Sequence, residues 1–214
     1  MRSIYLFIFT VFFANNAKAQ EIYISSGTNT TNFDYQSSNG TDENLNFRSG
    51  TGNYLEVGYA HGLINYKLLY SIGFTYNEYN SKASNLSTNY SWKTKYLGIT
   101  NKVSYNLSKE YSECSHYGSG LRTFLSIGFN TSKLLSGEQY INNYYYDLVG
   151  TEDFSGIIVQ PFAGINSQYN ISRNFKLTMG YNFSKSFSLL NDSSEKISFN
   201  THQLQIGLLM SVYR

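Results

Sequence analysis

The stretch YKLLYSIGFTY, residues 66–76, decides the fold class of this chain. Its even positions are apolar with a tyrosine at each end, its odd positions are small or polar, and only Leu69 departs from the alternation. Successive side chains of a β-strand point to opposite faces, so the pattern predicts a strand with one apolar and one polar side. Ten steps along a tilted strand cover about 25 Å, close to the apolar thickness that a membrane-spanning strand must cross. The apolar face is therefore expected to contact lipid.

The beginning of the chain has the composition of an export signal. Arg2 precedes an apolar run, and a small-residue cleavage site, AKA, ends at Ala19. We therefore predict a signal peptide over residues 1–19 and one domain over residues 20–214. The apolar run is shorter than the roughly 20 residues of a transmembrane helix, and no comparable run follows it. Any membrane span in the mature chain is thus expected to consist of strands.

The composition also favours a membrane interface. The chain holds 21 Tyr and 15 Phe but a single Pro and a single Trp, and tyrosine combines an apolar ring with a polar tip. The formal net charge of +2 resides in Arg2 and Lys18 of the signal, and no cluster of Lys and Arg stands out, so nucleic acid is not expected as a partner. The lone Cys114 cannot form an internal disulfide.

Period-two alternation recurs in eight segments, at about residues 21–33, 45–60, 66–76, 90–106, 120–133, 156–170, 174–187 and 200–213. Short links at 61–65 and 171–173 alternate with longer polar stretches at 34–44, 78–89, 134–155 and 188–199, and only the link at 107–119 is long for its end. Short turns at one end and long loops at the other are typical of transmembrane barrels. We therefore predict an all-β, eight-stranded antiparallel up-and-down transmembrane β-barrel, with short periplasmic turns, longer extracellular loops and both termini on the periplasmic side.

Two residues disturb the pattern. Asn101 falls on the apolar side of its segment, and Pro161 falls inside another segment although proline cannot donate to a strand ladder. We interpret Pro161 as the site of a β-bulge, with a wrongly assigned strand as the alternative.

The polar faces predict a narrow, filled lumen. Each segment carries a glycine on its polar face: Gly27, Gly58, Gly73, Gly98, Gly128, Gly164, Gly180 and Gly207. An eight-stranded barrel is only just wide enough to be filled by side chains, so small residues must make room for large ones. We expect hydrogen bonds and ion pairs to plug the lumen through a polar network of Glu56, Lys67, Lys102, Arg122, Gln160, Lys176 and Gln203, with Gln168 and Gln205 on the same faces. Leu69 is expected to point into this lumen beside Lys67.

With these strands, the export signal and the final strand ending near Tyr213, the chain resembles the eight-stranded outer-membrane β-barrel proteins of Gram-negative bacteria, the OmpA-like barrel domain and its OmpX and PorT relatives. The resemblance covers nearly the whole mature chain. It implies a monomer in the cell outer membrane, in contact with outer-membrane lipid and lipopolysaccharide. It does not imply a particular activity.

No catalytic, cofactor-binding or metal-binding residues are predicted. The histidines, His61, His116 and His202, do not lie at metal-ligand spacing with another His, Cys or carboxylate. Some eight-stranded barrels are enzymes acting on lipid A, for which His202 and Ser198 are candidates here by parity, although ordinary loop-end residues explain them as well.

The long loop at 134–155 is the expected site for a partner. It is acidic and carries Tyr140, Tyr144, Tyr145 and Tyr146, and exposed tyrosines suit recognition of an extracellular protein or glycan. Near the same end, Lys82, Lys93 and Lys95 could meet lipid A phosphates, with ordinary exposed lysines as the alternative.

Three functions remain open from the sequence. The first is a non-enzymatic outer-membrane barrel with a structural or surface-interaction role through its extracellular loops. The second is a soluble exported β-barrel or sandwich that binds a small ligand or glycan, in which Phe74 and Met179 would be buried. The third is an enzyme that modifies lipid A.

Overall fold

The computed structural model describes residues 20–36, 46–63, 67–85, 88–108, 120–142, 144–151, 154, 156–172, 174–189 and 196–212. The predicted signal peptide, Cys114, His116 and Tyr213 lie outside these residues. Within the described ranges, no helix is both long and apolar enough to pass through a membrane.

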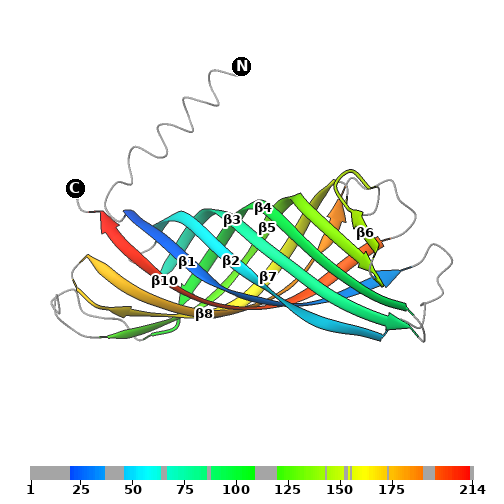
Figure 1. The fold of residues 1–214 in the computed structure, drawn as a ribbon. Helices are drawn as coiled ribbons and strands as arrows, with labels where there is room; N and C mark the ends of the chain where they lie inside the picture. The colour runs from blue at the N-terminus through cyan, green and yellow to red at the C-terminus, as the bar shows by residue number, and fades with distance from the viewer. Residues whose placement is uncertain are drawn as a thin grey trace, which may run out of the picture.

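Eight strands, all those of the described residues except the short β6 and β9, form a closed antiparallel ring. In chain order the ten strands are β1 (Gln20–Gln36), β2 (Asn46–Leu63), β3 (Leu68–Asn85), β4 (Thr88–Asn106), β5 (Leu121–Ile141), β6 (Tyr144–Asp147), β7 (Ile157–Asn170), β8 (Phe175–Lys185), β9 (Phe187–Leu189) and β10 (Lys196–Val212). Each strand of the ring pairs with its neighbours, β5 pairs with β7, and β1 closes the ring on β10 (Figure 1). The short strands β6 and β9 are added to β5 and β7. The predicted eight-stranded barrel is confirmed.

The two ends of the barrel differ, and we name them by what they carry. The turn end holds Gln20 and Val212, which are paired in the closing ladder, and the loop end holds β6 (Figure 1). At the turn end, Leu69 is buried with Tyr23 and Leu209, so its predicted burial is confirmed, but Lys67, which was expected beside it, is exposed.

The outer surface of the barrel is apolar through its middle. Phe74 is 75% exposed and Met179 is 62% exposed, and outward side chains of every strand in the ring join them. On β4, for example, Leu97, Ile99 and Val103 are all exposed. The soluble alternative, in which Phe74 and Met179 are buried, is therefore wrong. A belt of this kind around a closed ring is stable where lipid surrounds it.

The two disturbed positions are accommodated without a bulge. Asn101 accepts a hydrogen bond of 2.8 Å from the hydroxyl of Tyr70 on the outer face. The β5–β7 register runs unbroken through Pro161, so the predicted bulge is wrong. The irregularity lies on the other side of β7, where its ladder stops between β8 and β9 near Ser186. This interruption accommodates a residue that has no N–H to donate.

Two strands, β3 and β5, extend well beyond the predicted boundaries at the loop end, and β4 begins two residues before its predicted start. The stretch at 78–89 was expected to be a loop, but β3 and β4 pair as far as Asn85 and Thr88, and β5 continues to Ile141. In the β3 extension the outward residues Glu78, Asn80 and Lys82 are polar and the buried residues include Tyr79 and Ala83, which is the reverse of the membrane-spanning part. An aromatic cluster therefore covers the lumen at the loop end: Phe33, Tyr79, Ala83, Trp92, Tyr96, Leu148, Phe154, Ile158 and Phe199.

Candidate functional site

A buried carboxylate forms the centre of the lumen. Glu56 is 1% exposed and accepts a hydrogen bond of 2.6 Å from the hydroxyl of Tyr23 and a short one from the hydroxyl of Tyr54. Gly58 and Gly73 are cross-strand partners, and a Cβ on either would lie 2.6 or 2.7 Å from the Tyr23 hydroxyl oxygen. The glycines are thus required for the close approach of Tyr23 to Glu56.

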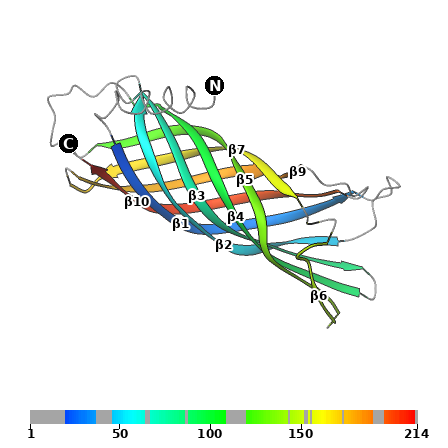
Figure 2. The same cartoon turned by 90° about the horizontal axis from the view of Figure 1, so that it is seen from above.

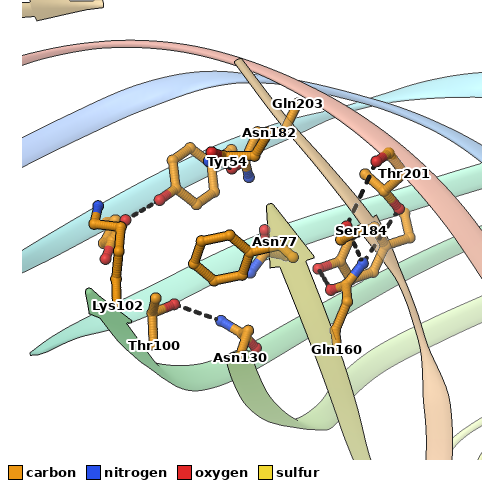
Figure 3. Close-up of a pocket in the computed structure, with 13 residues that line it drawn as sticks. Tyr54, Asn77, Thr100, Lys102, Asn130, Gln160, Asn182, Ser184, Thr201 and Gln203 are labelled. Carbon is orange, nitrogen blue, oxygen red and sulfur yellow. Dashed lines mark hydrogen bonds between the residues drawn. The ribbon is translucent and has the colours of Figure 1, made fainter. Parts of the chain in front are cut away.

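A second group of hydrogen bonds lies toward the loop end (Figure 3). Gln160 accepts a bond of 2.6 Å from the Tyr79 hydroxyl and donates one of 2.9 Å to Ser184 Oγ. Gln203 donates to Asn29 Oδ1 at 3.0 Å and accepts from Asn182 at the same distance. These bonds link β1, β3, β7, β8 and β10 across the barrel.

Basic side chains of the lumen are held by neighbours from other strands. The ammonium of Lys176 forms an ion pair with Glu21, and Ser211 also donates to Glu21 at 3.1 Å. The ammonium of Lys102 lies 5.3 Å from the ring centroid of Tyr23, a distance at which cation–π attraction operates.

The predicted polar network is only partly placed in the lumen. The structure places Glu56 and Gln160 in buried positions and Lys102, Arg122, Lys176 and Gln203 in half-buried ones. Lys67 is different, because it lies in the turn before β3 and is exposed. The prediction that Lys67 takes part in a buried network is corrected, since β3 begins at Leu68 and the Lys67 side chain is exposed. The sequence reasoning missed Tyr23, Tyr54 and Glu21, although large side chains on the polar faces of strands were a usable signal.

The space left in the lumen is small. One cavity of about 30 Å³ lies among Tyr54, Glu56 and Gln160, and a second of about 40 Å³ lies among Tyr23, Leu69 and Gln205. Lys102 lines both cavities. Each cavity has room for about one or two water molecules.

The candidate enzymatic pair does not form a dyad. His202 and Ser198 lie on the same face of β10, four residues apart, which corresponds to about 13 Å along a strand and exceeds hydrogen-bond reach. His202 Nδ1 instead lies 2.7 Å from the hydroxyl of Tyr181 on the outer surface. Among the described residues, no three His, Cys, Asp or Glu side chains form a group that could hold a metal ion.

The predicted partner loop folds as a hairpin that projects from the loop end (Figure 2). Strands β5 and β6 pair from Glu138 with Asp147 to Ile141 with Tyr144. The turn contains Asn142 at a φ of 52°, and its side chain accepts a bond of 2.9 Å from the backbone N–H of Asn89 on β4. This contact fixes the hairpin against the neighbouring strand.

Tyrosines cover both faces of this hairpin. Tyr144 is 73% exposed, and Tyr146 lies on the same face, while Tyr145 packs against Tyr140 on the other face with ring centroids 5.7 Å apart. Lys93 lies 5.7 Å from the Tyr140 ring centroid. The Tyr140 hydroxyl donates to Glu138 at 3.2 Å, and this bond to a carboxylate raises the pKa of Tyr140. We call Tyr140, Tyr144, Tyr145 and Tyr146 the tyrosine hairpin.

The hairpin leaves a strand edge uncovered. Within the described residues, β6 pairs with β5 alone, so its outer backbone edge has no strand beside it. Directly after β6 the chain turns inward, where Leu148 is buried and its N–H donates to Gly137 at 2.9 Å. The exposed edge and the cover of the lumen are therefore continuous in sequence.

No protein-family model matches the sequence, and no curated protein is significantly similar to it. Solved structures are similar in backbone. Neisserial surface protein A is 13% identical with a TM-score of 0.48, covering 88% of this chain and 96% of that one. The outer membrane protein OprG from Pseudomonas aeruginosa is 10% identical with a TM-score of 0.46, covering 92% and 98%. Ail, the attachment invasion locus protein of Yersinia pestis, is 13% identical with a TM-score of 0.43, covering 90% and 99%. The closed ring and its apolar belt make this chain an eight-stranded transmembrane β-barrel of the outer-membrane type.

Proposed function

We propose that the chain is a non-enzymatic outer-membrane barrel that acts through the tyrosine hairpin, which it displays outside the cell to contact a protein or glycan. The observation that carries this proposal is the exposure of Tyr144, Tyr145 and Tyr146 on a hairpin held rigidly by the barrel wall. Tyrosine contributes a large contact area with little loss of side-chain entropy, so such a surface suits binding.

The small size of the lumen cavities supports this assignment. Its cavities of about 30 and 40 Å³ are too small for a solute, and the aromatic cluster lies between them and the loop end. We propose that the barrel does not conduct ions. The separation of His202 from Ser198 and the hydrogen bond between His202 and Tyr181 favour a role without catalysis at that surface.

Membrane insertion and sidedness are tested first. The chain should remain in urea-washed outer membranes and migrate faster on gels unheated than boiled. In a Cys114→Ser background, a membrane-impermeant thiol reagent should label Tyr145→Cys on intact cells but not Asn174→Cys at the turn end. Extraction by urea would refute the membrane assignment, and labelling only of Asn174→Cys would refute the orientation.

Binding is tested with vesicles that carry the chain, on arrays of glycans and of extracellular proteins. We expect binding that is lost on replacing Tyr144, Tyr145 and Tyr146 by serine. Replacing Tyr105 and Tyr169, which are exposed on the outer surface toward the turn end, should leave binding unchanged. Equal binding by the hairpin variant and the wild type would refute the role of the tyrosine hairpin.

A further inference from the structure

A carboxamide faces the membrane at the middle of the apolar belt. From the loop end, the outward residues of β4 within the belt are Leu97, Ile99, Asn101, Val103 and Tyr105, and the four besides Asn101 are apolar or aromatic and exposed. Asn101 is the third of the five and lies about 13 Å along the strand from either end of the series. Its side chain is therefore surrounded by hydrocarbon, away from water and from lipid headgroups.

The Asn101 carboxamide has unused hydrogen-bonding capacity. The hydroxyl of Tyr70 donates to Asn101 Oδ1 at 2.8 Å, and no other described residue forms a hydrogen bond with this side chain. Its cross-strand partners, Ile72 on β3 and Phe129 on β5, are apolar. Within the described part of the chain, the two N–H groups of the carboxamide and the second lone pair of its oxygen thus have no partner. Unpaired polar groups are unfavourable in hydrocarbon, so a polar group from outside the barrel would be bound here.

We propose that two copies of the chain associate in the membrane through the outer face of β3, β4 and β5, with their Asn101 carboxamides paired. A carboxamide carries both donors and an acceptor, so two of them form reciprocal hydrogen bonds from the Nδ2 of each to the Oδ1 of the other. All copies lie at the same depth and in the same orientation, so a two-fold axis along the membrane normal brings Asn101 opposite Asn101. An unrelated protein would need a polar group at this depth, whereas a second copy always has one.

The residues around Asn101 suit such a contact. Ile72 and Phe129 are exposed on either side of it, and the strongly exposed Phe74 projects from β3 next to Ile72. The two-fold axis places β3 of one copy opposite β5 of the other, so the Phe74 ring of each copy faces the apolar surface of its partner. The pairing departs from the monomer that the family resemblance implies. It rests on the membrane location of the barrel and not on the proposed role of the tyrosine hairpin.

The experiment uses the full mature chain folded in phospholipid vesicles, in a Cys114→Ser background. Donor and acceptor dyes are attached to separate batches at Asn174→Cys, and energy transfer is followed as the chain is diluted with lipid. We expect transfer that falls with dilution, as a reversible dimer requires. Asn101→Leu should weaken association about tenfold, on the scale of hydrogen bonds between membrane-spanning segments. Asn101→Gln keeps a carboxamide and should retain association.

Ser26→Leu is the matched control. Ser26 is also polar and exposed on the outer surface, but it lies on β1, three strands away from β4 around the ring. Removing its hydroxyl should leave association unchanged, as should serine in place of the exposed tyrosines of the hairpin. Tyr70→Phe removes the hydrogen bond within the barrel and leaves the Asn101 carboxamide in place, so it should not weaken association.

Several results would overturn the proposal. Absence of energy transfer at every dilution would show that the chain is a monomer. Equal association of Asn101→Leu and the parent chain would show that copies meet elsewhere, and an equal loss in Ser26→Leu would show that no particular face is used. Leucine is favourable at a lipid-facing position, so Asn101→Leu should fold, and the gel mobility of each unheated variant checks this. A chain that associates through Asn101 but binds nothing through its hairpin refutes the proposed function alone.

Discussion

Replacing Glu56 by alanine is expected to lower the free energy of unfolding by about 4 kcal/mol. The change leaves the buried hydroxyls of Tyr23 and Tyr54 without an acceptor, and each unsatisfied buried group costs roughly 1–3 kcal/mol. Glu56→Gln keeps the side-chain volume and one acceptor oxygen, so it should cost only about 1–2 kcal/mol. The order of the two variants is therefore part of the prediction.

Trp92 provides the assay. It is the single tryptophan of the chain and is buried in the aromatic cluster, with the Phe33 ring centroid 5.9 Å away. Its fluorescence should follow urea unfolding of the barrel in phospholipid vesicles.

Glu78→Ala is the control, since Glu78 also accepts from a tyrosine hydroxyl but lies half-buried at the rim, where water can replace it. This control should lose less than about 1 kcal/mol. A Glu56→Ala variant as stable as Glu78→Ala would refute the view that the Tyr–Glu–Tyr contact stabilises the barrel.

Three further outcomes are expected. Gly73→Ala places a Cβ 2.7 Å from the Tyr23 hydroxyl oxygen and should destabilise the barrel by about 1–3 kcal/mol in the same unfolding assay, with wild-type stability as the contradicting result. Met179→Arg puts a charge on the lipid-facing surface and should cost about 2–4 kcal/mol in vesicles, whereas no loss would contradict the membrane assignment. Ultraviolet titration should show that Tyr140 ionises above the ordinary pKa of tyrosine, because the Glu138 carboxylate accepts a hydrogen bond from the Tyr140 hydroxyl. The folded hairpin thus holds the hydroxyl proton of Tyr140 more tightly than the unfolded chain does. The hydrogen bond therefore contributes to stability fully below the ordinary pKa of tyrosine, and this contribution is lost as the pH rises through the raised pKa of Tyr140. Glu138→Gln should lower the pKa of Tyr140 toward its ordinary value.

The membrane-spanning part of the fold was predictable because lipid and lumen impose opposite chemistry on alternate residues. Ile72 and Phe74 had to face lipid while Ser71 and Gly73 faced the lumen, and the structure places them so. The strand count and the burial of Leu69 followed from the same alternation.

The strand extensions were missed for a physical reason. Beyond Tyr76 the outer surface meets water, so Glu78 and Lys82 face outward while Tyr79 is buried inside. The alternation continues with its polarity reversed, and a search for one constant apolar face interprets the reversal as a loop. Reading each segment for period two without a fixed polarity would have extended β3.

The partners of Glu56 could not be deduced in the same way. Tyr23 lies on the neighbouring strand β1, where it pairs with Gly58, two residues from Glu56, so its contact with Glu56 depends on the β1–β2 register. The pattern within a strand defines its two faces but does not define which residues of neighbouring strands lie beside each other. The register of the β1–β2 ladder determines this contact.

The reversal of polarity near Tyr76 also sets the depth of the protein in the bilayer. An outward shift by one pair of residues would expose the ring of Phe74 to water, and an inward shift would submerge Glu78, Lys95 and Lys133 in hydrocarbon. Both shifts are unfavourable, so the barrel is held to within roughly 7 Å along a strand, the length of two residues. The same boundary keeps the tyrosine hairpin at a constant height above the membrane. A partner anchored in a facing surface would have to present its binding site at that height.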